Sequence, residues 1–167
     1  MNKLLLGCII LLAAFSRLAP HPPNFTPILS IALFSGFCFK NNYAFIVPLS
    51  IMLVSDYFIG SFEMALWVYP PILLIFYLGN SLMKKNSYKN ILFGSIVSSL
   101  IFFLITNFGS WYGNLIYLQN FNGLLSSYVA GIPFYKNTLI STILYSSILF
   151  SVHGYLLKKY NHQYQSL

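Results

Sequence analysis

The chain has 167 residues, of which 7% are charged and 57% hydrophobic, with a formal net charge of +7. Because a soluble domain carries about 25% charged residues, this composition and the mean hydropathy of +0.72 predict a polytopic membrane protein. The basic residues stand singly or in pairs between apolar runs, which argues against nucleic-acid binding. We therefore expect one all-α membrane domain over residues 1–167.

Six apolar runs have the length of transmembrane helices. In chain order they cover residues 3–19, 27–39, 43–61, 65–83, 90–108 and 138–157. The second run is short, because a helix over residues 27–39 reaches about 20 Å against a hydrocarbon core of about 30 Å. Pro48 is expected to kink the third helix or to be accommodated by its neighbours.

The first apolar run resembles a signal peptide only in part. Lys3 precedes it, but the apolar stretch before Cys8 is too short for the hydrophobic region of a signal peptide. Arg17 interrupts the far end of the run, where a cleavage site would stand. We therefore expect an uncleaved first span.

Basic residues set the predicted orientation. Because cytoplasmic loops are enriched in Lys and Arg, the chain is expected to have both termini in the cytoplasm of a bacterium, as a multi-pass protein of the cytoplasmic (inner) membrane. Arg17 and Lys136 then lie outside, together with both acids, Asp56 and Glu63. The residues on the inside are Lys3, Lys40, Lys84, Lys85, Lys89, Lys158 and Lys159.

The segment between the fifth and sixth runs is too long for a plain loop. Residues 115–135 contain apolar side chains at helical spacing, interrupted near their start by Gln119 and Asn120. We predict a short helix that lies on the outer surface as a lid over a site. A seventh span is the alternative, and it would place Lys158 and Lys159 outside.

The stretch from Arg17 to Pro27 carries the strongest functional signal. Four of the eight residues in 20–27 are prolines, which cannot continue a helix. At membrane depth, non-helical backbone survives only when it is buried in protein or lines a wet cavity. Other outer loops add polar and aromatic residues, as a small-molecule site requires. The candidate substrate-binding residues are His21, Asn24, Phe25, Thr26, Asp56, Trp67, Asn107, Trp111 and Tyr128.

Each of these candidates has a purely structural alternative. Asp56 is expected just below the membrane interface, where a carboxylate suggests a function, and Arg17 is its expected ion-pair partner. The pair is equally compatible with a salt bridge that touches no ligand. His21 either contacts a ligand or only fixes the proline-rich loop. Trp67 and Trp111 are also explained by the aromatic belt of a membrane interface.

The sequence motifs give little support for a catalytic or a metal-binding function. Cys8 and Cys38 both lie inside apolar runs, and the sequence has no hydrolase, zinc or nucleotide-binding motif. We therefore predict a binding protein without cofactor or metal. An intramembrane hydrolase and a structural or assembly subunit without ligand are the alternatives.

Four motifs resemble a known family. The first, Arg17-Leu18-x-Pro20-His21-Pro22-Pro23-Asn24-Phe25-Thr26-Pro27, is similar to the signature of an uncharacterised bacterial family of small membrane transport proteins. The resemblance continues in Val47-Pro48-Leu49 with Ser55-Asp56, in Thr106-Asn107-Phe108-Gly109-x-Trp111, and in Tyr128–Phe134 followed by Asn137-Thr138. More distantly, that family resembles the S-components of energy-coupling-factor vitamin transporters, nearest the solitary cobalamin-uptake type.

The resemblance implies an S-component-like bundle of six helices with cytoplasmic termini and an outer site for a vitamin or cofactor precursor. His21 and Asp56 correspond to a histidine and an aspartate of the cobalamin type. The cysteine that many of its members use as a cobalt ligand has no counterpart in the outer loops. A cobalamin-like substrate is therefore one option among several.

The resemblance also bears on energy coupling. S-components dock on a partner ATPase module through an Ala-x-x-x-Ala patch in the first helix, but here Ala13 is followed four residues later by Arg17. We therefore favour a solitary protein over one with a permanent ATPase partner. Small residues at Ala32 and Gly36, and at Ser95 and Ser99, are expected to pack within the monomer.

Overall fold

The computed structural model describes residues 11, 15, 20–39, 42–60, 63–83 and 86–165. Over these residues the fold is all-helical, as predicted. The helices are α2 (Ile28–Cys38), α3 (Ile46–Ile59), α4 (Ala65–Leu82), α5 (Tyr88–Trp111) and α6 (Phe121–Gln165), and the short 3-10 helix η1 (Asn42–Phe45) precedes α3. The predicted first span, 3–19, lies outside the described residues except for Leu11 and Phe15.

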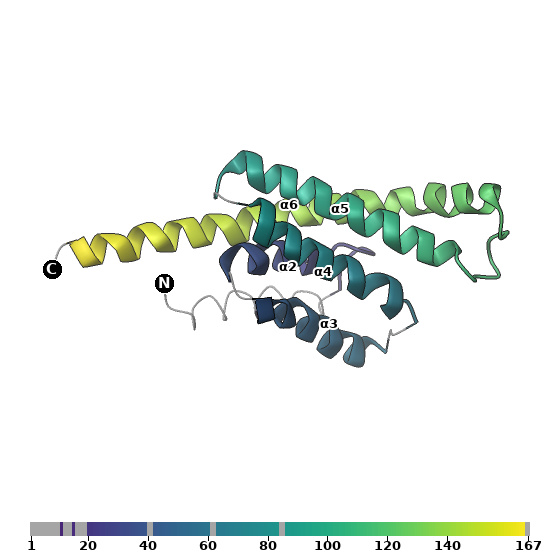
Figure 1. The fold of residues 1–167 in the computed structure, drawn as a ribbon, viewed down its shortest axis with the longest axis horizontal. Helices are drawn as coiled ribbons and strands as arrows, with labels where there is room; N and C mark the ends of the chain where they lie inside the picture. The colour runs from purple at the N-terminus through teal and green to yellow at the C-terminus, as the bar shows by residue number, and fades with distance from the viewer. Residues whose placement is uncertain are drawn as a thin grey trace.

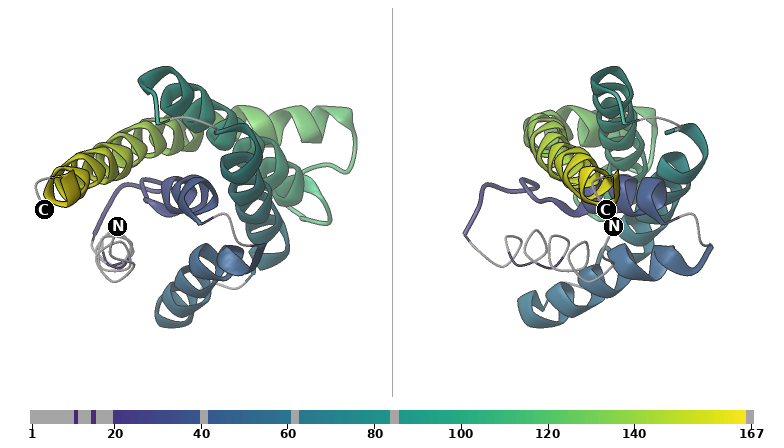
Figure 2. Two further views of the ribbon diagram at one scale, coloured as in Figure 1. Left: turned by 60° about the vertical axis from the view of Figure 1, so that its left-hand side comes forward. Right: turned by 90° about the vertical axis from the view of Figure 1, so that its left-hand side faces the viewer.

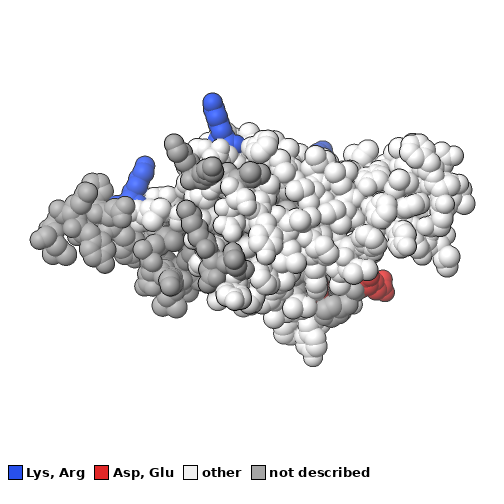
Figure 3. Space-filling model, in the orientation of Figure 1, with Lys and Arg blue, Asp and Glu red and all other residues white. Residues whose placement is uncertain are grey.

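Successive helices run in opposite directions along the long axis of the molecule (Figure 1). One end, at the right of Figure 1, gathers the first residues of α2, α4 and α6 and the last residues of α3 and α5. We call it the acidic end, because Glu63 lies two residues before α4 and Asp56 lies in the last turn of α3. The opposite end, the basic end, carries Lys89 near the start of α5 and Lys158 near the end of α6. Figure 3 shows blue side chains towards this end, a further blue patch nearer the middle, and red near the acidic end.

The core is built around α2. This helix lies between α4 and α6, and α3 lies to one side (Figure 2). All residues from Ile28 to Gly36 are buried, which explains why α2 is apolar on every side. Its close packing depends on two glycines, because a Cβ on Gly36 would collide with the carbonyl of Phe76, and one on Gly79 with the carbonyl of Leu33.

Buried small residues therefore lie between helices of this chain, as predicted. Ala32, Ser95 and Ser99 are each fully buried. The hydroxyl of Ser30 donates a hydrogen bond to the carbonyl of Thr142 over 2.9 Å and so joins α2 to α6. Because these residues face neighbouring helices, they are occupied within the monomer.

The third helix begins where its proline requires. Pro48 is the third residue of α3, directly after η1. In the first turn of an α-helix a missing N–H costs nothing, because that N–H would have no helical partner. Pro48 therefore lies at the start of α3, where η1 ends, and not in the middle of a helix that it would kink.

The predicted lid is wrong as a separate element. Residues 115–120 form a turn, and the rest of the segment is the first part of α6, which continues through Pro133 for 45 residues. Just before Pro133, two side chains join α6 to α5: the Tyr128 hydroxyl donates to the Leu104 carbonyl over 2.9 Å, and Ser127 Oγ lies 3.2 Å from the Asn107 carbonyl. A proline that tertiary contacts support bends a helix without ending it.

Two of the described helices are long and apolar enough to cross a membrane, by length and composition. They are α5 and the part of α6 from Phe121 to Lys159. The other three are apolar but shorter. Six spans, as predicted from the sequence, are not seen among the described residues.

Candidate functional site: a two-lobed cavity at the acidic end

A cavity with two adjoining lobes opens between the helices near the acidic end. The lobes have volumes of about 300 Å³ and about 190 Å³ and share four lining residues, Asn24, Met64, Val68 and Phe102. The larger lobe is also lined by Thr106, Asn107, Ser110, Tyr117, Ser127, Ala130, Gly131 and Phe134. The smaller lobe adds Thr26, Ile28, Met52, Asp56 and Ala65.

The larger lobe is bounded by the α5–α6 contact. Asn107 Nδ2 donates to the Phe103 carbonyl over 2.8 Å, which fixes the amide, because only its nitrogen can donate to a carbonyl. The side chain of Asn107 fills the space beside Gly131, where a Cβ would collide with it. Ser127 is 1% exposed and lies one turn before Gly131, so both small residues bring α6 close to α5.

The smaller lobe contains a buried carboxylate. Asp56 is 2% exposed, and the Tyr69 hydroxyl donates to its Oδ2 over 2.9 Å. A buried carboxylate is costly unless hydrogen-bonded and paired, so this donor stabilises the lobe. The predicted partner, Arg17, lies outside the described residues.

The proline-rich loop closes one side of both lobes and is non-helical, as predicted. The Phe25 N–H donates to the Pro22 carbonyl over 3.0 Å, and Asn24 between them has a left-handed φ of 61°, which asparagine tolerates better than most residues. Asn137 on α6 donates to the Pro23 carbonyl over 3.0 Å. This bond holds the loop against α6, with Asn24 and Thr26 lining the cavity.

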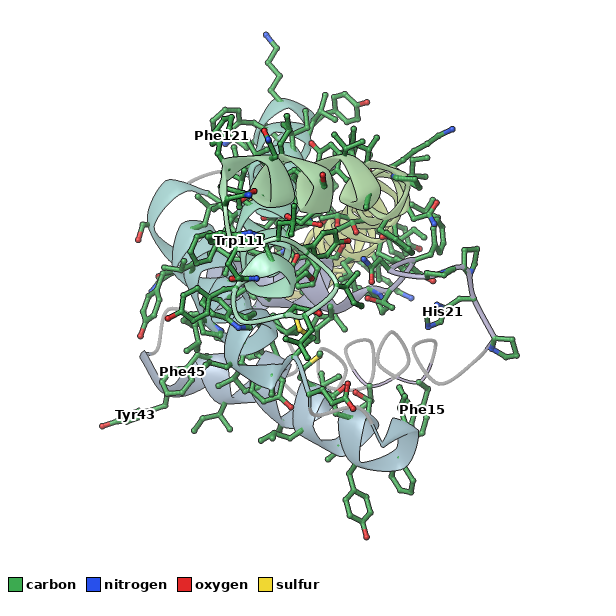
Figure 4. The ribbon with its side chains drawn as sticks, turned by 90° about the vertical axis from the view of Figure 1, so that its right-hand side faces the viewer. Phe15, His21, Tyr43, Phe45, Trp111 and Phe121 are labelled. Atoms are coloured by element: carbon green, nitrogen blue, oxygen red, sulfur yellow. The ribbon has the colours of Figure 1, made fainter. Side chains whose placement is uncertain are left out.

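Four of the nine predicted site residues therefore line the cavity, and two others from the loop do not. Asn24, Thr26, Asp56 and Asn107 are the four. The ring of Phe25 packs edge-on against Tyr145 with centroids 6.2 Å apart. His21 Nδ1 donates to the Pro22 carbonyl over 2.9 Å, and Figure 4, which views the acidic end, shows His21 at the margin of the molecule, apart from Trp111.

The three remaining predicted residues support the walls of the cavity instead of lining it. The ring of Trp67 fills the space beside Gly109, where a Cβ would collide with it. Trp111 Nε1 donates to the Leu118 carbonyl over 2.9 Å and thereby fixes the turn after α5. The Tyr128 hydroxyl is used by the α5–α6 contact described above.

Several lining residues were missed by the sequence analysis. Met64, Val68, Phe102 and Phe134 belong to apolar runs whose composition does not separate a cavity wall from a lipid-facing surface. Ser127 and Gly131 carried a usable signal, because two small residues four apart mark a close helix contact. Tyr69 does not line either lobe but donates its hydroxyl proton to Asp56.

Among the described residues, no three His, Cys, Asp or Glu side chains come close enough together to form a metal site. Cys38 lies at the end of α2, at the basic end and away from the cavity. The cavity instead offers amide, hydroxyl and carboxylate groups among apolar side chains, a combination that binds and orients small organic molecules.

Comparison with known proteins places the chain in a family. Nothing among curated proteins or solved structures matches it. The model of one protein family, described as a family of unknown function (DUF6580), matches residues 1–166. The chain therefore belongs to the DUF6580 family.

Proposed function

We propose that this chain is a membrane protein that binds a small molecule in the two-lobed cavity for uptake into the cell. The observation that carries the proposal is the cavity itself: Asn24 and Thr26 of the proline-rich loop, Asp56 of α3 and Asn107 of α5 are distant in the sequence and line two adjoining lobes. Polar groups that only stabilised helix contacts would not need such a space. This arrangement favours a ligand site over a purely structural subunit.

The proposal places the bundle across the bacterial cytoplasmic membrane with the acidic end outside. Several features support this. The helix α5 has 24 residues and reaches about 36 Å, which exceeds a hydrocarbon core of about 30 Å. Large apolar side chains on α5 and α6, such as Phe93, Leu104 and Val129, are exposed. Of the described lysines, Lys89, Lys158 and Lys159 lie towards the basic end, which the positive-inside rule assigns to the cytoplasm. The six-span topology with cytoplasmic termini belongs to this proposal.

The volume of the cavity suggests the size of the ligand. The larger lobe, at about 300 Å³, stands at the lower limit for pockets that enclose drug-sized molecules. A vitamin or cofactor precursor of modest size fits this space. A cobalamin-like molecule is much larger, and its entry would require the walls to separate.

Uptake without a permanent ATPase partner is part of the proposal. The small-residue stripes at Ala32–Gly36 and Ser95–Ser99 are used inside the monomer, so neither offers a docking stripe for a coupling subunit. A hydrolase has less support, because His21, the base that it would need, donates to the Pro22 carbonyl and does not line the cavity.

Native mass spectrometry of the gently purified protein tests the proposal. Ala130 lines the larger lobe, whereas the neighbouring Val129 is 57% exposed, so Ala130→Phe fills the cavity and Val129→Phe is its matched control. We expect a co-purified small mass on the wild type and on Val129→Phe, and its loss from Ala130→Phe. Retention by both variants would place the bound molecule elsewhere, and a mass found on none of the three proteins counts against a ligand site.

A further inference from the structure

A second pocket lies between α4 and α5 at the basic end, and it shares no lining residue with the two-lobed cavity. Its volume is about 240 Å³. The described residues that line it are Leu78, Met83, Asn90, Phe93 and Gly94. Met83 is 5% exposed and Phe93 is 62% exposed, so the pocket has a buried floor and a rim on the outer surface of the bundle.

The turn between the two helices fixes the mouth of this pocket. Ser87 caps α5, and its Oγ accepts a hydrogen bond from the Asn90 N–H over 3.3 Å. Asn86 Nδ2 donates to the Phe150 carbonyl over 3.0 Å and so ties the turn to α6. The pocket is therefore formed by the fold itself, and no loop has to be ordered when it is filled.

The lining of the pocket favours an apolar occupant. Asn90 is the single polar side chain among the described lining residues, so a water-soluble molecule would leave most of its hydrogen-bonding groups unpaired when it gave up its hydration. The volume also lies below the range of about 300–1,000 Å³ for pockets that enclose drug-sized ligands. A hydrocarbon chain has neither difficulty, because it has no polar groups to pair and only one segment of it needs to fit.

A cation stands at the rim, where it can hold a negative headgroup. Lys89 precedes Phe93 by one helical turn and therefore lies on the same face of α5, and both residues are exposed. The sequence has two further lysines, Lys84 and Lys85, directly after Met83. Basic sites between membrane helices on the cytoplasmic side bind anionic lipid headgroups. A lysine can do so while its stem lies along apolar surface.

The apolar lining and the cation together fit a membrane lipid. In the membrane orientation of the proposed function, on which this inference rests, the pocket lies in the cytoplasmic leaflet. We propose that it binds one acyl chain of an anionic phospholipid, with the phosphate of that lipid at Lys89. A zwitterionic phospholipid has the same chains without the net negative charge, so it occupies the pocket more weakly.

Native mass spectrometry with two added lipids tests the role of the headgroup. The full-length protein in detergent is titrated with phosphatidylglycerol and with phosphatidylethanolamine that carry the same acyl chains, and we expect tighter binding of phosphatidylglycerol. Lys89→Gln should weaken that binding about fivefold, the effect of one lysine near a membrane surface. Lys158→Gln, with the same loss of charge at the same end of the molecule, should bind as the wild type does. Equal binding of the two lipids, or equal losses in the two variants, would overturn the inference.

A variant that fills the pocket tests the place of the acyl chain. Leu78→Trp enlarges a lining side chain, whereas Leu74→Trp makes the same change one turn earlier on α4, at a residue that is 50% exposed and does not line the pocket. We expect phosphatidylglycerol to be lost from Leu78→Trp and kept by Leu74→Trp and by Ala130→Phe. Retention by Leu78→Trp would overturn the inference and leave the proposed uptake standing. Loss from Ala130→Phe would place the lipid in the two-lobed cavity and count against both.

Discussion

The side chain of Asn107 in α5 occupies the space that a side chain at Gly131 in α6 would need. The same amide is held by the Phe103 carbonyl within its own helix. A glycine on one helix and a fixed amide on the other therefore set the distance between α5 and α6 at the larger lobe.

Gly131→Ala should destabilise the protein, because the new methyl group collides with an amide that cannot turn without losing a hydrogen bond. We expect a loss of about 1–3 kcal/mol, the usual cost of overpacking, measured as a lower midpoint of thermal unfolding in detergent. The double variant Asn107→Ala with Gly131→Ala should recover most of the loss, since the space is then free. Additive losses would show that the two residues do not meet.

Gly36→Ala should destabilise the protein more than Gly94→Ala. At Gly36 a Cβ meets the backbone of Phe76, which can move only with its helix, whereas at Gly94 it meets the flexible ends of Leu33 and Met83 at 3.1 and 3.2 Å. We expect at least about 2 kcal/mol for Gly36→Ala and under about 1 kcal/mol for Gly94→Ala. Denaturant unfolding of both variants in the same detergent gives the comparison, and equal losses contradict the assigned packing of α2 on α4.

Tyr69→Phe removes the hydroxyl that donates to the buried carboxylate of Asp56. Because hydrogen bonds to charged groups are worth about 1.5–3 kcal/mol, the free energy of unfolding should fall by an amount in that range. Tyr77→Phe is the control, since Tyr77 lies on the same helix but is 45% exposed. A Tyr69→Phe protein as stable as Tyr77→Phe would remove the assigned contact.

The orientation in the membrane predicts which positions a membrane-impermeant thiol reagent can reach in intact cells. With Cys8 and Cys38 replaced by serine, a cysteine at position 115 should be labelled, because Leu115 lies fully exposed in the turn at the acidic end. A cysteine at position 158, at the basic end, should be labelled only after the cells are opened. The reverse pattern would invert the topology.

The helices were predictable where one apolar run makes one helix. Residues 65–83 and 90–108 correspond to α4 and α5 within three residues at each end, because their apolar length is uninterrupted. The start of the sixth run was misjudged: it was predicted at residue 138, whereas α6 begins at Phe121 and continues through Pro133. A proline indicates a break by its chemistry, but α6 is in contact with α5 through Ser127 and Tyr128 just before Pro133 and continues past it.

The candidate site was predictable for residues that are unusual in an apolar chain. Asn24, Thr26, Asp56 and Asn107 are polar groups in or beside apolar runs, and burial requires such groups to meet partners or a cavity. Tryptophan and tyrosine gave no such guidance. Their rings fill space beside glycines and their polar atoms bond to backbone, as those of Trp67 and Trp111 do, so the same residue types serve packing as readily as binding.

The shortness of α2 sets how far inward a bound molecule lies. With 11 residues the helix reaches about 16 Å, and it begins at Ile28, which lines the smaller lobe. In the proposed orientation the C-terminal end of α2 points to the cytoplasm, and if that end lies at the boundary, Ile28 lies near the middle of a hydrocarbon core of about 30 Å. If the proposed function holds, a molecule resting on Ile28 lies about halfway through the hydrocarbon core, above α2 and the helices α4 and α6 that pack against it.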